Sequence, residues 1–181
     1  DTNEFGEKQA RLPGDVGAHA GEFAAAAGKE FPDATVLSFE PLRSCQKAWH
    51  TNTAKIGSRE LYACALGSEN GVAVIHRNAY TPASSLLHGE ALLTRAFPHT
   101  FHSRDEKVRI RRLDDILYGR TLRGPILLKI DVQGFEDRVL SGARETLKKV
   151  DAVLIELTEK RLYKEQAMEG DIRSLLEHSG F

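Results

Sequence analysis

The stretch Asp15-Val16-Gly17-Ala18-His19-Ala20-Gly21 decides the fold of this chain. An alanine-rich run over residues 22–29 follows it and predicts a helix, because alanine is the best helix former. The β-branched and apolar segment Thr35–Phe39 then predicts a strand, which ends before Pro41 because proline cannot continue a central ladder. A turn of small residues in front of a helix lets a ligand approach the backbone and meet the free N–H groups of the helix.

The rest of the chain alternates between apolar strands and amphipathic helices. The pattern predicts strands over residues 61–66, 72–75, 108–111, 125–131 and 153–157, and helices over 42–53, 114–117, 136–149 and around Ile172, Leu175 and Leu176. The pair Asn70-Gly71 predicts a hairpin between the strands at 61–66 and 72–75. Because strands that alternate with helices imply βαβ units, we expect an α/β, Rossmann-like fold with a doubly wound, mostly parallel sheet.

The domain organisation is expected to be simple, with residues 1–181 forming a single domain. Residues 1–12 are polar and predict a lead-in. Residues 77–107 show no clear period, which predicts a long loop or lid. His99 and His102 in this loop are three residues apart, but the absence of an apolar period favours solvated histidines, and no metal site is expected.

The composition argues against several classes of function. The chain has 25 Lys and Arg against 26 Asp and Glu. Because strong sequence-independent binding of nucleic acid needs an excess of basic residues, it is not expected here. No apolar run approaches the roughly 18 residues that span a bilayer, and the acidic, polar start argues against a signal peptide. Cys45 and Cys64 make neither a disulfide framework nor a zinc quartet, which predicts reduced thiols in a cytoplasmic protein.

Acidic residues follow the predicted strands. Glu40, Asp131 and Glu156 stand at carboxyl ends of strands, where open α/β sheets bind their ligands. Asp15 lies beside the small-residue turn. Like charges at one rim repel each other, so a cationic or hydroxyl-rich ligand would explain them. Glu40 lies 23 residues after Gly17, a spacing that matches the acid that binds ribose hydroxyls. The turn, the helix, the strand and Glu40 together therefore predict a nucleoside cofactor site.

The glycine pattern distinguishes between cofactors. The dinucleotide fingerprint G-x-G-x-x-G does not fit, because His19 stands where that pattern needs its second glycine. The residues fit D-x-G-x-x-x-G, and with it the chain resembles the FkbM-type methyltransferases that depend on S-adenosylmethionine (SAM). The stretches that carry the resemblance are 15–23, 39–41, 65–67, 84–86, 113–115, 155–157 and, most specifically, Leu128-Lys129-Ile130-Asp131-Val132-Gln133-Gly134-Phe135-Glu136. The resemblance implies a class I methyltransferase fold and O-methylation, often of sugar hydroxyls or natural products.

The resemblance also implies where the cofactor binds. The implied residues are Asp15, Gly17 and Gly21 around the methionyl part of SAM, Glu40 at the ribose, and Ala65 and Leu66 beside the adenine. An acid such as Asp15 suits the cationic methionyl end better than it would suit a phosphate. His19 in the same turn is a candidate for orienting the methionyl carboxylate or for proton transfer.

Methyl transfer to a hydroxyl needs a group that removes the hydroxyl proton. Asp131, at the end of a buried strand, is the first candidate for this base or for a substrate anchor, and Glu156 and Glu136 are the second candidates. For each of them a helix-capping or structural role is the alternative. Lys129 is expected to pair its amine with an acid of this rim. The expected acceptor is a small-molecule or sugar hydroxyl.

Two positions depart from the family pattern. His19 stands where the family more often has asparagine, and Gln133 stands where glutamate is usual. The place of the first strand, residues 9–14, contains proline and glycine, which a central strand disfavours. Either that strand is very short, or residues printed there as neighbours are not adjacent in the molecule.

The C-terminal part predicts an exposed sheet edge. The sequence stops at Phe181, where class I methyltransferases add two more strands, so the strand at 153–157 would lie at an apolar edge. We expect a truncated domain, or an edge covered by a partner such as the second copy of a homodimer.

Two other functions stay open at this point. Glu40 also fits an NAD-dependent oxidoreductase, although the missing second glycine disfavours that class. Gln133 and the short C-terminal part also fit a SAM- or nucleoside-binding module without catalysis. Titration with SAM and with NAD discriminates between the two cofactors.

Overall fold

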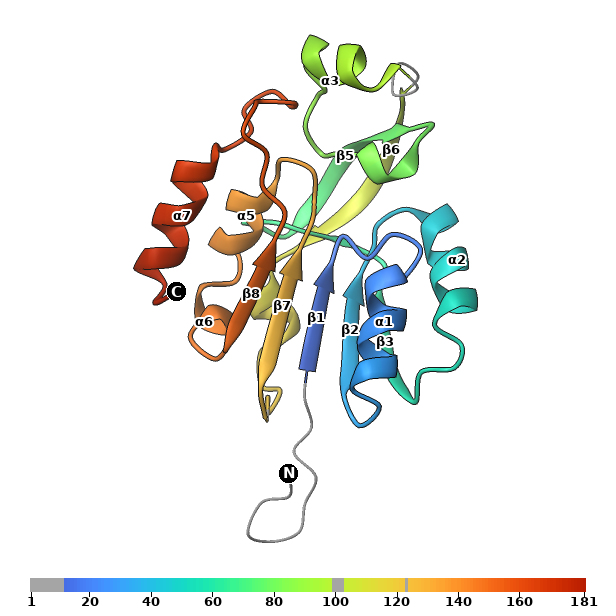
Figure 1. The fold of residues 1–181 in the computed structure, drawn as a ribbon, viewed down its shortest axis with the longest axis vertical. Coiled ribbons are helices and arrows are strands. Elements are labelled where there is room, and N and C mark those ends of the chain that lie inside the picture. Colours follow the sequence, from blue (N-terminus) through green and yellow to red (C-terminus); the bar gives the residue numbers. More distant parts are fainter. Residues whose placement is uncertain (1–11, 99–102, 123) are drawn as a thin grey trace, which may run out of the picture.

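A five-stranded parallel sheet forms the centre of the computed structural model, which describes residues 12–98, 103–122 and 124–181 (Figure 1). The strand order is β3-β2-β1-β7-β8. These strands are β1 (Leu12–Val16), β2 (Thr35–Phe39), β3 (Ser58–Tyr62), β7 (Ile126–Ile130) and β8 (Ala152–Ile155). Every neighbouring pair in this sheet is parallel, which confirms the expected α/β, Rossmann-like fold with a mostly parallel sheet.

A second sheet of three strands lies beyond the carboxyl ends of the first, beside α3 (Figure 1). Its order is β4-β6-β5, with β4 (Ala65–Leu66), β5 (Gly71–Asn78) and β6 (Ser103–Arg111). Strands β5 and β6 are antiparallel over their whole length, whereas β4 runs parallel to β6. The second sheet therefore stands where the parallel strands end.

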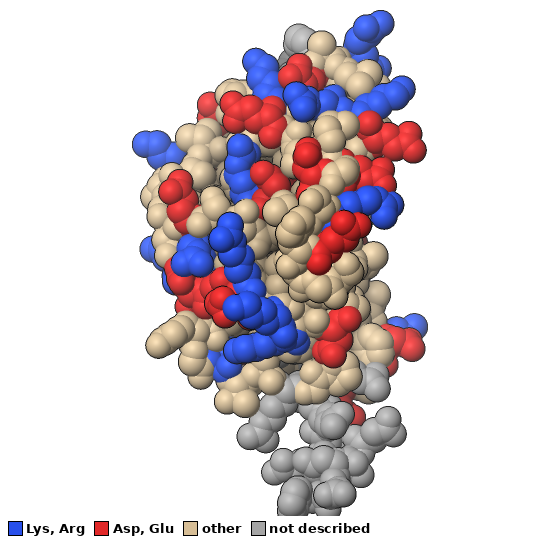
Figure 2. Space-filling view, turned by 90° about the vertical axis from the view of Figure 1, so that its left-hand side faces the viewer, with Lys and Arg blue, Asp and Glu red and all other residues tan. Residues whose placement is uncertain are grey.

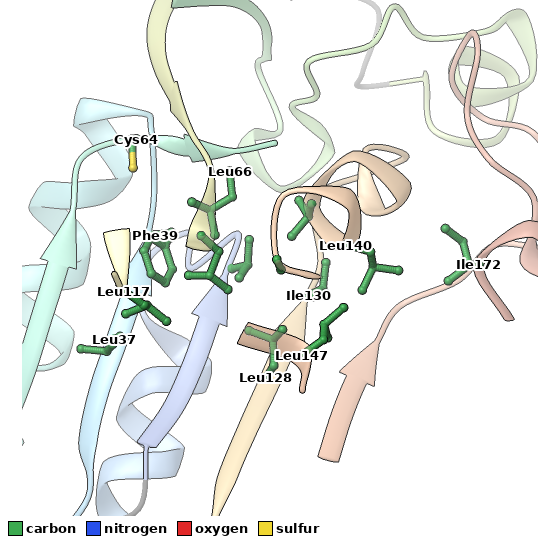
Figure 3. Close-up of a cluster of buried hydrophobic side chains, with 14 residues drawn as sticks. Leu37, Phe39, Cys64, Leu66, Leu117, Leu128, Ile130, Leu140, Leu147 and Ile172 are labelled. Carbon is green, nitrogen blue, oxygen red and sulfur yellow. The ribbon is translucent and has the colours of Figure 1, made fainter. Parts of the chain in front are cut away.

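Helices cover both faces of the parallel sheet. α1 (Glu22–Glu30) and α2 (Arg43–Asn52) lie on one face, and α4 (Leu113–Ile116), α5 (Glu136–Ser141) and α6 (Arg144–Leu147) lie on the other, with α7 (Glu169–His178) against α5. The 3-10 helix η1 (Thr81–Ala83) and α3 (Ala91–Ala96) lie apart from these faces, η1 against β5 and α3 beside the second sheet (Figure 1). Successive side chains of a strand point to opposite faces. Val36 of β2 accordingly packs in a cluster with α1 and α2, while Leu37 and Phe39 belong to the larger cluster with α4, α5 and α6 (Figure 3).

The first strand is central despite its proline. β1 has five residues and lies between β2 and β7. Its pairing with β2 begins only at Gly14, so Pro13 stands near the start of the strand, where a missing N–H disturbs the ladder least. At five residues β1 is as long as β2, β3 and β7, so the expectation of a very short strand is wrong.

The predicted strand at 61–66 and its hairpin are wrong. The chain bends at residues 63–64, so β3 ends in the parallel sheet and β4 belongs to the second sheet. β4 and β5 do not pair with each other but flank β6. The Asn70 side chain fixes this turn against the end of β6, where its Oδ1 accepts hydrogen bonds from Arg111 Nε at 3.1 Å and Arg112 N at 3.0 Å. A local turn signal cannot show that a third strand enters between the two arms.

The predicted loop at 77–107 is correct only in part. Most of β6 and the end of β5 fall within it, together with η1 and α3. The part of β6 in this range is mostly charged, and the end of β5 reads Arg77-Asn78, so neither part shows the apolar alternation by which a strand is recognised. His99 and His102 lie outside the described residues.

The predicted helix at 136–149 is two helices. Gly142 separates α5 from α6, and a Cβ at this position would overlap the carbonyl oxygen of Gly67. Asp114 then starts α6, because its Oδ1 accepts hydrogen bonds from the backbone and hydroxyl of Thr146, each at 2.8 Å. A contact with a distant loop thus interrupts a segment whose own residues favour one continuous helix.

β8 lies at one edge of the parallel sheet, as expected. It covers residues 152–155 rather than 153–157, and Leu154 is 53% exposed. The face of the molecule on this side mixes acidic, basic and uncharged side chains (Figure 2).

Candidate functional site

The strand order places a topological switch point between β1 and β7. From β1 the chain continues to β2 and β3 on one side, whereas β7 and β8 lie on the other side. Open α/β sheets bind ligands at such a point, outside the carboxyl ends of the strands. A cavity of about 660 Å³ lies there, a volume in the usual range of small-molecule sites.

The cavity collects most of the residues that the sequence singled out. Those in its wall are Gly17, His19, Glu40, Ala65, Leu66, Asp131 and Glu156. Asp15, Gly21 and Glu136 are not part of the wall. The segment formed by residues 80–86 contributes further polar groups, which include Thr81 and Ser85. Other polar residues of the wall are Glu22, Lys129, Gln133 and Thr158.

Gly17 allows the turns after β1 and β7 to touch. It has a positive φ of 76°, and a Cβ there would overlap the carbonyl oxygen of Asp131. Its N–H donates to Phe39 O at 3.2 Å, so the turn is also tied to the end of β2. Only glycine has neither a Cβ nor a strong preference against this φ, which explains the residue type.

Gly21 has a different task. It precedes α1 with a φ of 86°, and a Cβ there would lie 2.7 Å from Trp49 Cδ1 and 2.9 Å from Thr53 Cγ2. Gly21 therefore lets α1 approach α2, and its effect on the cavity passes through the position of α1.

Lys129 lies between two of the acids at the switch point, Asp15 and Asp131. Its Nζ donates to Gly17 O at 3.0 Å and lies 3.3 Å from Asp15 Oδ1 and 3.5 Å from Asp131 Oδ2. Its side chain is only 14% exposed. The expected pairing of this amine with a rim acid is confirmed.

Asp15 is fully buried at the end of β1. Burial raises the pKa of its carboxyl, and the nearby Lys129 ammonium opposes that increase. Within the part of the chain that the structure describes, neither of its oxygens accepts a hydrogen bond. A buried carboxylate with one ion-pair partner retains negative potential that a cationic ligand group would stabilise.

Glu40 lies at the end of β2, with 5% of its surface exposed. Its Oε1 accepts a hydrogen bond from Leu42 N at 2.7 Å, and its Oε2 accepts one from His19 N at 2.9 Å. Burial raises the pKa of this carboxyl to about 7, although the two backbone N–H groups lower it. Since a carboxylate has about four acceptor positions, two stay available for the hydroxyls of a ligand.

His19 connects the β1 turn with the 80–86 segment. Its Nε2 lies 2.8 Å from Thr81 Oγ1, and its Nδ1 lies 3.5 Å from Glu22 Oε1. The residue has a positive φ of 48°, a conformation that asparagine adopts more easily than other L-residues. The conformation therefore suits the asparagine that the family resemblance implies here, and the histidine adds a contact between two parts of the cavity wall.

Asp131 and Glu156 form a carboxylate pair at the ends of β7 and β8. Gln133 Nε2 donates to Asp131 Oδ1 at 2.8 Å and to Glu156 Oε2 at 3.0 Å. A hydrogen bond with Asp131 raises the pKa of the Glu156 carboxyl, partial burial raises it further, and Gln133 lowers it. Such a pair holds a proton more readily than an isolated carboxylate, which suits a group that accepts one during catalysis.

Glu136, the other candidate base, faces the loop behind the cavity. It is 5% exposed, and its Oε1 accepts hydrogen bonds from Gly134 N at 3.0 Å and Val132 N at 3.3 Å. Burial raises the pKa of its carboxyl against these bonds. Through these hydrogen bonds Glu136 stabilises the loop that contains Gln133.

Sequence reasoning missed two contributors to the site. Tyr163 lies in an irregular segment before α7, and its hydroxyl is 3.2 Å from Gln133 Oε1. Ser85, which the sequence analysis included only in the stretch 84–86, is buried and donates to Gln133 O at 2.6 Å. No periodicity or spacing signals either contact, because both join segments that are far apart along the chain.

Other types of site find no support in the described ranges. In residues 12–98, 103–122 and 124–181 no group of three or more His, Cys, Asp or Glu side chains has an arrangement that could hold a metal ion. Over the same ranges, the helices are too short or too polar for any of them to traverse a bilayer.

Comparison with known proteins agrees with this geometry. A model of the methyltransferase FkbM domain matches residues 15–181. The chain is similar to a protein named Methyltransferase 1 from Beauveria bassiana (strain ARSEF 2860), with 27% identity over 184 aligned positions that cover 92% of this chain and 70% of that protein. No solved structure matches the chain at a significant level.

Proposed function

The chain belongs to the FkbM methyltransferase family, and from this premise we propose that it transfers a methyl group from SAM to a hydroxyl of a small molecule or sugar. One observation carries the proposal. A single cavity at the switch point joins the Gly17 turn and Glu40 to the carboxylate pair of Asp131 and Glu156. A nucleoside cofactor and a proton acceptor would thus share one space.

The residues near β1 and β2 fit SAM. Glu40 has acceptor positions available for both ribose hydroxyls, and the buried Ala65 and Leu66 offer an apolar wall to the adenine. Asp15 is buried behind the turn, where its carboxylate form would stabilise the positively charged methionyl end. The helix α1 starts behind the same turn, and its N-terminus would favour a methionyl carboxylate bound there.

The carboxylate pair supports O-methylation. Bound SAM supplies an electrophilic methyl group, which the acceptor oxygen takes while the electrons of the broken C–S bond stay on sulfur. The hydroxyl proton then needs an acceptor within hydrogen-bond reach. We assign this role to Asp131, with Glu156 as its partner, because both stand in the cavity wall.

Calorimetric titration tests the cofactor. We expect SAM to bind and NAD to bind at least tenfold more weakly, because His19 stands where the dinucleotide pattern needs its second glycine and Asp15 suits a cationic group better than a pyrophosphate. Tight binding of NAD with no binding of SAM would replace this proposal by an oxidoreductase.

Labelled SAM tests the reaction. Screening against sugars, glycolipids and polyketides identifies an acceptor, and Asp131→Ala is then expected to lower kcat by about 100-fold while SAM still binds. Unchanged turnover in that variant would remove Asp131 from the reaction. Failure of every acceptor despite SAM binding would favour a binding module without catalysis.

The location of the protein is a separate proposal. Cys45 and Cys64 are both free and buried, which suits a reducing compartment such as the cytoplasm. Fractionation of cells that produce the protein tests this.

A further inference from the structure

Gln133 lies between Asp131 and Glu156 and has an unusual backbone conformation. Its φ is 56°, in the left-handed region that long side chains rarely adopt. The hydroxyl of Ser85 donates to its carbonyl oxygen at 2.6 Å, and Glu136 binds the N–H groups of Val132 and Gly134 on either side. The surrounding structure therefore holds this residue in a costly conformation, which is common where geometry serves function.

The side-chain amide has only one favourable orientation. Tyr163 is 2% exposed, and its hydroxyl lies 3.2 Å from Gln133 Oε1 and 3.1 Å from Ala83 O. The single hydroxyl hydrogen of Tyr163 lies within reach of both acceptors, so the acids on the other side of the amide decide its orientation. The amide nitrogen then faces Asp131 and Glu156, where a flipped amide would place an oxygen against two carboxylates.

Two carboxylates this close repel each other unless a donor or a shared proton separates them. An amide NH2 has two hydrogens, and here one points to each acid. We propose that Gln133, hydrogen-bonded to Tyr163, is a positioning residue that holds Asp131 and Glu156 together as one proton-accepting pair facing the acceptor hydroxyl. This inference rests on the proposed methyl transfer and adds to it the residues that set the base.

Other charges also face this pair. Lys129 Nζ lies 3.5 Å from Asp131 Oδ2 and attracts its negative charge. Glu136 and Asp15 repel the acids from the loop behind and from β1. Tyr163 is uncharged at neutral pH, because burial raises the pKa of its hydroxyl above the ordinary value. The amide of Gln133 is thus the neutral contact that touches both acids, while Lys129 reaches one of them.

Two variants test the role without adding charge. Gln133→Met removes both donors, and Tyr163→Phe keeps the ring in its apolar cluster while removing the hydroxyl. Tyr62→Phe is the matched control, because the Tyr62 hydroxyl donates to Glu60 at 2.8 Å, outside the cavity. Native NMR spectra establish that each variant is folded.

The first readout is the titration of the side-chain carboxyl carbons in protein labelled with 13C at Asp and Glu, assigned with Asp131→Asn and Glu156→Gln. We expect Gln133→Met to raise the pKa of Glu156 and Tyr163→Phe to raise it less, whereas Tyr62→Phe leaves it unchanged. Titrations of Gln133→Met and Tyr163→Phe that coincide with wild type would overturn the proposal.

The second readout is methyl transfer to an acceptor found by screening. Gln133→Met is expected to lower kcat by about tenfold and to leave KM for SAM within about twofold. The acidic limb of the profile of kcat against pH should move to higher pH, because the pKa of the acid pair increases. Loss of activity with an unchanged profile would assign Gln133 a merely structural role. SAM binding is measured in parallel, so absent binding in wild type refutes the proposed function, whereas normal binding with unaltered titrations refutes only the role of Gln133.

Discussion

Replacing Lys129 by methionine would separate the two acids from their shared cation. Methionine keeps most of the apolar stem and removes the ammonium, so Asp15 stays fully buried but loses the positive charge 3.3 Å away. The carbonyl oxygen of Gly17 also loses its donor at 3.0 Å. Breaking a buried ion pair at one partner leaves an uncompensated charge, which costs about 3–5 kcal/mol. For a chain of this size the melting temperature should fall by about 6–20 °C.

The loss of folding stability in Lys129→Met should depend on pH, and its direction follows from the pKa of Asp15. Burial already raises the pKa of Asp15 above its ordinary value of 3.8, and Lys129 is the largest influence that lowers it. Without Lys129 the folded-state pKa rises further. An acid whose folded pKa exceeds its unfolded pKa reduces stability as pH rises from the unfolded towards the folded value. The deficit of Lys129→Met should therefore be smallest near pH 4 and grow towards neutrality.

Urea denaturation followed by circular dichroism between pH 4 and 8 measures this deficit. Adding Asp15→Asn to Lys129→Met should recover a large part of the loss, because the buried charge is then gone. Lys148→Met is the control, since Lys148 pairs with Glu145 at 2.7 Å on the surface, and should cost less than about 1 kcal/mol. A deficit of that same small size in Lys129→Met, or no recovery by Asp15→Asn, would refute the reasoning.

Three further changes address the cofactor site and the sheet edge. Glu40 has its pKa raised to about 7, so its carboxylate forms as pH passes that value, and SAM affinity measured by calorimetry should be higher at pH 8 than at pH 6. Glu40→Gln should bind about 10-fold or more weakly and lose this pH dependence, and equal affinity in the variant would contradict the ribose contact. Gly17→Ala should destabilise the fold and abolish SAM binding because its Cβ overlaps Asp131, whereas Gly119→Ala, with a φ of 73° but open space, should cost only about 1 kcal/mol in urea titrations. If the β8 edge pairs two copies, light scattering should show a dimer that Leu154→Lys converts to a monomer of unchanged stability. A wild-type monomer at all concentrations would dismiss that interface.

The amino-acid sequence by itself determined the parallel sheet and the side of the cavity that Gly17 and Glu40 line. Residues 22–29 and 35–39 carry their helix and strand preferences locally, and the packing around β2 follows from the alternation of its side chains. The carboxyl ends of parallel strands meet at one edge, so Gly17, Glu40 and Asp131 had to come together once the strands were recognised.

Only the tertiary structure decided what surrounds those residues. The strand β6 enters between β4 and β5, Gly142 breaks a helix against Gly67, and Tyr163 contacts an amide 30 positions away in the chain. Each of these features depends on a contact between segments that are distant in the sequence. The free energy of that contact exceeds the local conformational preference of either segment. Periodicity records which face of an element is buried, but the partner that buries it is chosen by the packing of the whole chain.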